Sequence, residues 1–192
     1  MIFDEEFYNG GAGYPKYSEF SHFKTRAEWL SKNFPDEKII VIGCAYGYLL
    51  NYLPDAVGID KSEYAYKQKV NDRVFLADAS KYDYTDFTLI VSYNVLDCMT
   101  DEEVKNFISC SSKLKHYHVL CFYEDDNMAE EYKKYGYFIQ DRQWWFDLFS
   151  VVEQDVYLVE FATGYVWFKA AGEKEFTNTS LKSPITEVKV SD

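Results

Sequence analysis

The sequence predicts an α/β fold built on a mostly parallel β-sheet with helices on both faces. Short apolar β-type runs alternate with segments of helical apolar spacing through the middle of the chain. One of these runs, VIGCAYGYLL, breaks into Gly43, Ala45 and Gly47 before a helix-like pattern begins, and a second, DAVGID, closes on Asp60. Ligands of such sheets bind beyond the carboxyl ends of the strands. We therefore expect the functional site at these two breaks.

The elements follow in order along the chain. A first amphipathic helix is predicted where Phe23, Ala27 and Leu30 recur at helical spacing, and Thr100 with Glu103 offers a capping box for a later one. The strand-like runs are 38–42, 56–59, 73–76, 89–92 and 118–123, and the helix-like runs are 22–33, 48–52, 63–69, 101–113 and 128–134.

The pattern changes after Gly136. The run RQWWFDLF predicts a short aromatic helix, in which Trp144 and Trp145 cannot both be buried on one face. The two β-type runs DVYLVEF and GYVWFKA then follow, separated by only three residues, which is hairpin spacing.

The loop after the first strand indicates which kind of ligand binds. Small residues let a ligand approach bare backbone, and a carboxylate at the tip of the next strand, Asp60, is placed to accept hydrogen bonds from ribose hydroxyls. A dinucleotide fingerprint would need glycines where Ala45 and Tyr48 stand, and no Gly-Lys-Ser/Thr follows. An uncharged or zwitterionic adenosine derivative fits this loop better than NAD or ATP.

Four segments in order carry a resemblance. KIIVIGCAYGYLL, AVGIDKS, VFLADASKYDY and FTLIVSYNVLDCM resemble the sequential motifs of class I S-adenosylmethionine-dependent methyltransferases, over residues 38–123. The resemblance implies S-adenosyl-L-methionine as the cofactor. It also implies a Rossmann-like, seven-stranded sheet that ends in an antiparallel β-hairpin, with the last strand inserted between its two predecessors.

The same resemblance implies the cofactor contacts. The loop backbone would approach the methionine part, Asp60 would accept from the ribose, Asp78 from the adenine amino group, and the segment after the fourth strand would lie beside the sulfonium. The predicted cofactor-binding residues are Gly43, Cys44, Ala45, Tyr46, Gly47, Asp60, Lys61, Asp78, Ala79, Tyr93 and Asn94.

The candidates for a general base are His22, Glu124 and Asp125. A base is needed only where the acceptor must lose a proton. His118, the other histidine we considered, is interpreted as structural because strand polarity puts it far from the cofactor. We predict no metal site, although Asp97 with Asp126 and Asn127 superficially echoes the magnesium ligands of catechol-type methyltransferases.

The charge and the motifs of the chain favour some classes of methyl acceptor over others. The formal net charge is −12 and no basic stripe is present, so a small molecule, a saccharide or a protein side chain is favoured over nucleic acid. The residues Ser92–Val95 also lack the Asn/Asp-Pro-Pro-Tyr/Phe motif of the methyltransferases that act on amino groups of DNA bases. We predict a cytoplasmic protein, because the four cysteines lie far apart, no run of ~20 apolar residues occurs and the N-terminus is acidic.

Three parts are predicted along the chain. Residues 1–37 form a Tyr/Gly-rich segment and a helix that cap the cofactor site, residues 38–170 form the methyltransferase core, and residues 171–192 form a polar, mobile tail. For the first part a plain N-terminal arm, and for the last an added edge strand, remain alternatives. A non-catalytic scaffold of the same fold, or a protein that cleaves or sequesters S-adenosylmethionine, remains an alternative function.

Overall fold

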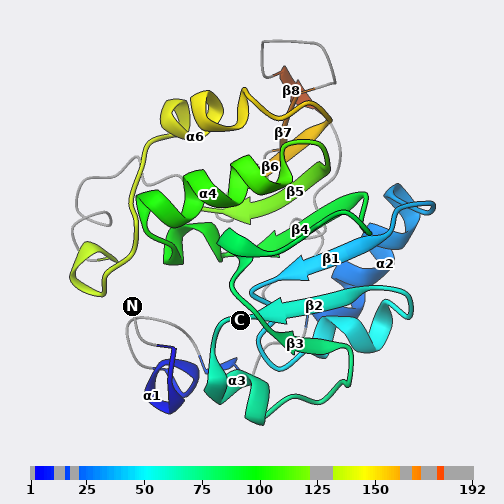
Figure 1. Cartoon of the computed structure of the whole chain (residues 1–192), viewed down its shortest axis with the longest axis vertical. Coiled ribbons are helices and arrows are strands. Elements are labelled where there is room, and N and C mark those ends of the chain that lie inside the picture. The colour runs from blue at the N-terminus through cyan, green and yellow to red at the C-terminus, as the bar shows by residue number, and fades with distance from the viewer. Residues whose placement is uncertain are drawn as a thin grey trace, which may run out of the picture.

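The computed structural model describes residues 3–10, 16–17, 22–121, 132–160, 166–169 and 177–179, and for the last two ranges the backbone only. One eight-stranded sheet forms the centre (Figure 1). Its strands are β1 (Ile39–Ile42), β2 (Val57–Asp60), β3 (Val74–Leu76), β4 (Leu89–Tyr93), β5 (Lys115–Leu120), β6 (Val156–Glu160), β7 (Val166–Lys169) and β8 (Thr177–Thr179). The α-helices are α1 (Glu5–Tyr8), α2 (Phe23–Asn33), α3 (Glu63–Lys67), α4 (Asp101–Ser111) and α6 (Arg142–Phe149), and the 3₁₀-helices are η2 (Tyr48–Tyr52), η3 (Ala79–Lys81) and η4 (Leu96–Cys98).

Six strands form a parallel Rossmann-like sheet in the order β3-β2-β1-β4-β5-β6. β7 then pairs antiparallel with β6, and β8 pairs antiparallel with β7. The predicted count of seven strands, with the last inserted between its two predecessors, was wrong. β5 pairs directly with β6 from His116↔Val156 to Leu120↔Glu160, which leaves no place for an inserted strand, so β7 lies on the outer side of β6.

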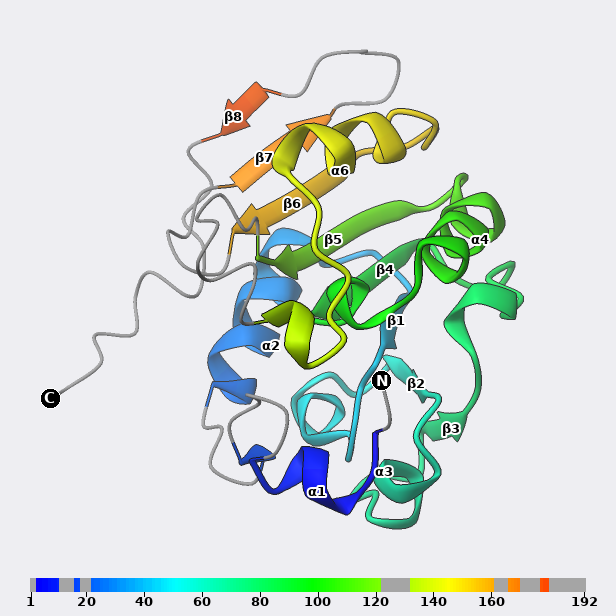
Figure 2. The same ribbon diagram turned by 90° about the vertical axis from the view of Figure 1, so that its left-hand side faces the viewer.

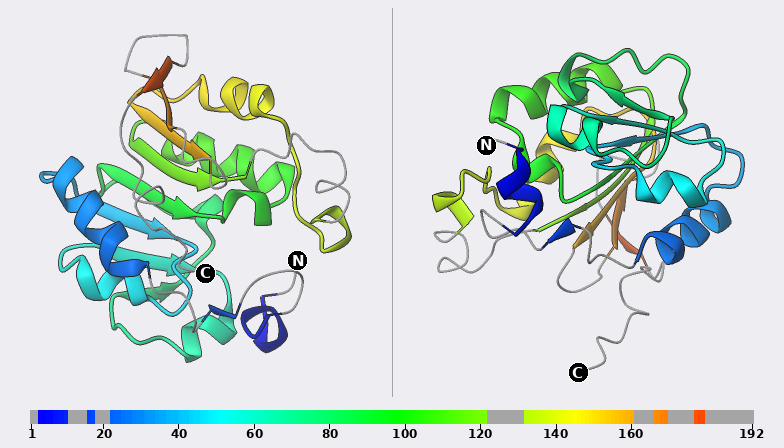
Figure 3. Two further views of the ribbon diagram at one scale, coloured as in Figure 1. Left: turned by 180° about the vertical axis from the view of Figure 1, so that it is seen from behind. Right: turned by 90° about the horizontal axis from the view of Figure 1, so that it is seen from below.

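The two faces of the sheet are covered by different helices. Seen as in Figure 1, α4 and α6 lie in front of the sheet, and seen from behind (Figure 3), α2 lies in front. Side chains of each strand alternate between the two faces. Ile40 and Ile90 therefore pack with Phe107 of α4, whereas Val41 packs with Leu30 of α2.

Local differences from the predicted elements have simple causes. β5 begins three residues before the predicted His118, because the histidines of KHYHVL are buried strand residues rather than polar loop residues. The capping box of α4 is confirmed, with Glu103 N donating to Thr100 Oγ1 and Thr100 N donating to Glu103. Most of the predicted helix at 128–134, and the tail apart from β8, lie outside the described residues.

The start of the chain lies at the carboxyl ends of the parallel strands. α1 lies beside α3, at the end of the sheet opposite β8 (Figure 2). Phe7, Tyr8 and Tyr17 pack there with Ala45 and Ala65 in a small aromatic cluster. None of the helices described is both long and apolar enough to cross a bilayer.

Candidate functional site

A pocket of about 670 Å³ opens at the carboxyl ends of β1, β2 and β4. Eight of the eleven predicted cofactor residues line it. These eight are Gly43, Ala45, Asp60, Lys61, Asp78, Ala79, Tyr93 and Asn94. The other lining residues were not predicted, and they are Phe3, Phe7, Tyr8, Ile59, Ala77, Val95, Cys98, Met99 and Glu103.

The loop after β1 brings bare backbone to the pocket. Gly43 has φ +60°, and a Cβ placed on it would lie 2.4 Å from Val95 Cγ2, so only glycine fits without a shift. Ala45 also adopts a left-handed conformation, with φ 49°. This loop therefore turns tightly and presents no large side chain to a ligand.

Asp60 ends β2 with its carboxylate buried against the loop. Its Oδ2 accepts from Ala45 N at 2.8 Å and its Oδ1 accepts from Ser62 N at 2.8 Å. Burial raises the pKa of Asp60, although the two amide hydrogen bonds and Lys61 oppose that shift. Each carboxylate oxygen has a second lone pair, so this fixed carboxylate still accepts two further hydrogen bonds.

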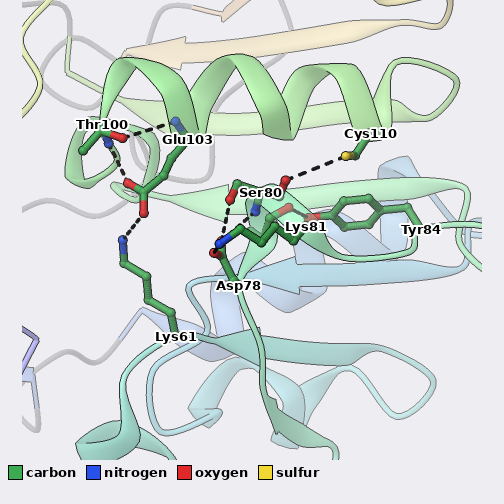
Figure 4. A network of polar contacts seen from close by, with 9 residues as sticks. Lys61, Asp78, Ser80, Lys81, Tyr84, Thr100, Glu103 and Cys110 are labelled. Carbon is green, nitrogen blue, oxygen red and sulfur yellow. Dashed lines mark hydrogen bonds and ion pairs between the residues drawn. The ribbon is translucent and has the colours of Figure 1, made fainter.

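Asp78 follows β3 and caps η3 (Figure 4). Its Oδ1 accepts from Ser80 N at 2.9 Å and from Ser80 Oγ at 2.7 Å, and its Oδ2 lies 3.0 Å from Lys81 Nζ. Partial burial would raise the pKa of Asp78, but these partners hold it below its usual value. Ala79 lies beside it, and its carbonyl accepts from Tyr84 Oη at 2.8 Å.

An ion pair links two elements at the rim of the pocket. Lys61 Nζ, just after β2, lies 3.1 Å from Glu103 Oε1 in the first turn of α4 (Figure 4). The Phe3 ring centroid lies 5.2 Å from the same ammonium nitrogen. The sequence predicts Glu103 only as part of a capping box, which gives no signal for its place at the pocket.

The N-terminal segment closes one side of the pocket. Ser62 Oγ donates to Phe3 O at 2.6 Å and accepts from Ala65 N at 3.0 Å, which ties the segment to the start of α3. The Tyr8 ring lies 5.2 Å from the Tyr46 ring, centroid to centroid. Phe3, Phe7 and Tyr8 therefore form an aromatic side of the pocket that also contains Asp60 and Asp78.

Asn94 provides an acceptor with no partner. It follows β4 with φ 54°, and its Oδ1 is buried with no hydrogen-bond partner among the described residues. Buried polar atoms are satisfied in most native structures. A ligand that donates a hydrogen bond would satisfy this atom.

Known structures show what this arrangement resembles. An S-adenosylmethionine-dependent methyltransferase from Thermotoga maritima, described as a possible histamine N-methyltransferase, is 16% identical with a TM-score of 0.50, over 86% of each chain. The chain has the fold of a class I S-adenosylmethionine-dependent methyltransferase. The N-terminal domain of EvdMO1, solved with S-adenosylhomocysteine bound, is 14% identical with a TM-score of 0.42, over 86% of this chain and 66% of that one. No protein-family model and no curated protein matches the sequence.

Several predicted site residues of this methyltransferase fold lie elsewhere. Tyr46 and Gly47 do not line the pocket, and Tyr46 instead packs in the aromatic cluster, where burial and Tyr64 raise its pKa to about 12. Cys44 lies against Gly58 of β2, where an added Cβ would be 2.7 Å from its Sγ, and it lines a neighbouring pocket on the side of α2. Burial raises the pKa of its thiol. A buried neutral thiol packs rather than reacts.

The candidate bases are placed less favourably. His22 precedes α2 and lines neither this pocket nor the one next to it, and Glu124 and Asp125 lie outside the described residues. No group of three or more acids, histidines or cysteines that could hold a metal occurs in the described part of the chain. Asp126 and Asn127 are not in that part.

Proposed function

We propose that this chain is a methyltransferase that uses S-adenosyl-L-methionine. The observation that carries the proposal is the pair of acids at the ends of β2 and β3, Asp60 and Asp78, in one pocket with the glycine loop after β1. Adenosine offers hydroxyl and amino hydrogens to such acids, and the loop itself presents only Gly43 and Ala45 to the pocket. The unpartnered Oδ1 of Asn94 adds an acceptor on the side of β4.

Different residues of the chain bind different parts of the cofactor. Asp60, held by two backbone amides, accepts from the ribose hydroxyls, and Asp78 with the backbone at Ala79 faces the adenine. Asn94 accepts from the amino group of the methionine part. Phe3, Phe7 and Tyr8 exclude water from one side. When bound, the cofactor supplies a sulfonium methyl group that an acceptor can attack in line.

Orientation in a dry pocket supplies much of the rate of such a transfer. No histidine lines the pocket among the residues described. Burial raises the pKa of the Tyr93 phenol, which therefore keeps its proton and cannot take one from an acceptor. The acceptor is a small molecule, a saccharide or a protein side chain. His22, Glu124 and Asp125 remain our candidates for proton removal. We also propose a cytoplasmic location, where cysteines stay as thiols, as the four in this chain are.

The test is calorimetric titration with S-adenosylmethionine and with S-adenosylhomocysteine. Wild type should bind both at micromolar concentration, and Asp60→Asn should lose most of that affinity, because one acceptor oxygen becomes a donor. Asp83→Asn is the matched control, since Asp83 caps an exposed turn at Thr85 and does not line the pocket. Absence of binding by folded wild type would overturn the proposal.

Product analysis then separates methyl transfer from the alternatives. With a competent acceptor, methyl transfer releases S-adenosylhomocysteine in equal amount to the methylated product. Cleavage of the cofactor releases no S-adenosylhomocysteine. Tight binding with no product from a broad panel of small molecules, saccharides and peptides would favour a non-catalytic binding protein.

A further inference from the structure

A second pocket of about 520 Å³ adjoins the first on the side of α2. Gly43, Tyr93 and Asn94 line both pockets, so the two meet at the ends of β1 and β4. Most of the second pocket is apolar, with walls formed by residues such as Phe23 and Leu49. Among the described residues that line it, Arg26 is the only charged one.

Arg26 is a buried cation with no acidic partner in the part of the chain that the structure describes. It is 8% exposed, and no described residue forms an ion pair or a side-chain hydrogen bond with it. Its Nε is buried with no partner among the described residues, and the guanidinium lies over the Tyr93 ring, whose centroid is 4.3 Å from the guanidinium carbon. A cation–π contact offsets only part of the cost of desolvating a charge.

The other two arginines of the chain have oxygen partners for their terminal guanidinium nitrogens. Arg73 donates to the carbonyls of Leu53, Ala56 and Leu50, and Arg142 lies 3.3 Å from Glu160. The fold therefore provides acceptors for a guanidinium elsewhere. Arg26 lacks them at the one place where the guanidinium faces a pocket.

A second donor lies beside the guanidinium. The Tyr93 hydroxyl is buried with no partner among the described residues. Burial raises the pKa of this phenol more than Arg26 lowers it, so the hydroxyl keeps its proton. A guanidinium and a phenolic O–H both donate, so together they suit an anionic oxygen, and the planar guanidinium suits a carboxylate in particular.

We propose that the second pocket binds a carboxylate through Arg26 and Tyr93. The inference rests on the proposed methyltransferase function and deepens it. The carboxylate has two possible sources, the amino-acid end of the cofactor and a carboxylate on the methyl acceptor. Both present the same group to the guanidinium, and both reach the junction at Gly43 and Asn94.

Three ligands separate these sources in calorimetric titrations of wild type and Arg26→Met. S-adenosylhomocysteine carries the amino-acid carboxylate, and 5′-methylthioadenosine keeps the adenosine and the sulfur without it. Benzoate, titrated into protein saturated with S-adenosylhomocysteine, probes an acceptor carboxylate. Lys32→Met is the matched control, because it removes an exposed positive charge from the last turn of the same helix.

A cofactor source predicts that Arg26→Met weakens S-adenosylhomocysteine roughly 30-fold or more and leaves 5′-methylthioadenosine unchanged. An acceptor source predicts that S-adenosylhomocysteine is unchanged and benzoate binding is lost. Arg26→Lys should recover part of the lost affinity, because it keeps the charge without the planar fork. If wild type binds S-adenosylhomocysteine and Arg26→Met matches it for all three ligands, the inference is overturned while the proposed function stands.

Thermal unfolding without ligand excludes a purely structural role. A buried cation without a partner costs stability, so Arg26→Met should unfold at the same or a higher temperature than wild type. A fall in unfolding temperature together with unchanged ligand affinities would assign Arg26 to packing against Tyr93 instead. No binding of S-adenosylhomocysteine by folded wild type would count against the proposed function itself.

Discussion

Two polar clusters that each include a residue of β4 lie on opposite faces of the sheet. On the face of α4 and α6, Ser92, His118 and His116 form a chain of hydrogen bonds, and His118 also packs against Phe107 and Phe149. On the face of α2, the neighbouring residue Tyr93 meets Arg26. Every ring nitrogen of the first cluster has a partner, whereas the second cluster has buried polar atoms with no partner among the described residues, although adjacent residues of β4 contribute to both.

The satisfied cluster fixes its own proton positions. His116 Nε2 lies 2.9 Å from Ser111 O, a carbonyl that only accepts, so this nitrogen carries the hydrogen. His116 Nδ1 then accepts from His118 Nε2 at 3.0 Å, and His118 Nδ1 accepts from Ser92 Oγ at 2.7 Å. Both rings are neutral and every ring nitrogen has a partner.

The contrast separates a structural polar cluster from a binding one. The histidine chain is fully buried and has no capacity left for a ligand. The Arg26 guanidinium, the Tyr93 hydroxyl and Asn94 Oδ1 line a pocket with unfilled capacity. Unsatisfied groups beside a cavity thus mark the site, whereas buried titratable groups alone do not.

The largest effect should come from breaking the satisfied chain. His118→Ala leaves the Ser92 hydroxyl and His116 Nδ1 without partners and opens a cavity in the core. We expect the free energy of unfolding to fall by roughly 3–5 kcal/mol, measured by urea denaturation. The affinity of the folded protein for S-adenosylhomocysteine should not change, because His118 lines neither pocket.

His22→Ala is the control for that variant. His22 is the one histidine of the sequence besides His116 and His118. It is partly exposed at the start of α2 and makes no side-chain cap bond there. The expected change in stability is within about 0.5 kcal/mol. A stable His118→Ala protein that no longer bound S-adenosylhomocysteine would contradict the structural role of the chain.

The second prediction concerns pH. Burial lowers the pKa of His116 to about 4 and also holds the pKa of His118 below its ordinary value. Between pH 6.5 and about 4 the unfolded chain therefore binds protons that the folded chain does not, so the free energy of unfolding falls as pH falls through this window. For His116 alone the loss is roughly 3 kcal/mol, since one unit of pKa corresponds to about 1.4 kcal/mol.

Urea denaturation at several pH values tests this, with wild type compared against a His116→Phe, His118→Leu double variant. The raised pKa of Asp60 acts in the opposite direction in both proteins, so the difference between them isolates the histidines. The double variant should lose less stability on acidification. Equal slopes in the two proteins between pH 4 and 6.5 would show that the histidines are not the cause.

The sequence predicted those site residues that directly follow or end a clear apolar strand. Gly43 and Asp60 stand at the ends of strands whose apolar runs are plain, so their places follow from the parallel sheet. Arg26 was missed, yet it carries a signal, because it lies three residues after Phe23 and four before Leu30 on the apolar side of the helix. A cation at an apolar position needs a partner, and here no described residue provides one.

The position of β7 had no local signal. Hairpin spacing predicts that two strands pair, but not on which side of the first strand the second lies. A Tyr/Gly-rich segment that caps the site was predicted, but the individual residues Phe3, Phe7 and Tyr8 were not. Their places depend on tertiary contacts, the hydrogen bond from Ser62 Oγ to Phe3 O and packing in the aromatic cluster.

The third prediction tests an unsatisfied atom without disturbing the backbone. Asn94→Gly keeps the left-handed conformation at φ 54° and removes the amide group. Affinity for S-adenosylhomocysteine should fall about tenfold, while the unfolding temperature changes little because no hydrogen bond within the described part of the chain is lost. Asn94→Asp, which keeps the acceptor oxygen, should bind more tightly than Asn94→Gly; weaker binding would argue against an amino group as the donor.

The smallest change in affinity should come from removing the ion pair at the rim of the pocket. The Lys61 and Glu103 side chains are 35% and 29% exposed, so their ion pair contributes at most about 1 kcal/mol. Lys61→Met should weaken S-adenosylhomocysteine by about two- to threefold, and the difference from wild type should shrink in high salt, because exposed charges are screened. Lys67→Met removes a more exposed pair with Glu63, away from the pocket, and should leave affinity unchanged. If Lys61→Met lost as much affinity for S-adenosylhomocysteine as Asn94→Gly, the comparison would fail. Binding would then depend on the paired charges at the rim and not on the unpartnered atoms inside the pocket.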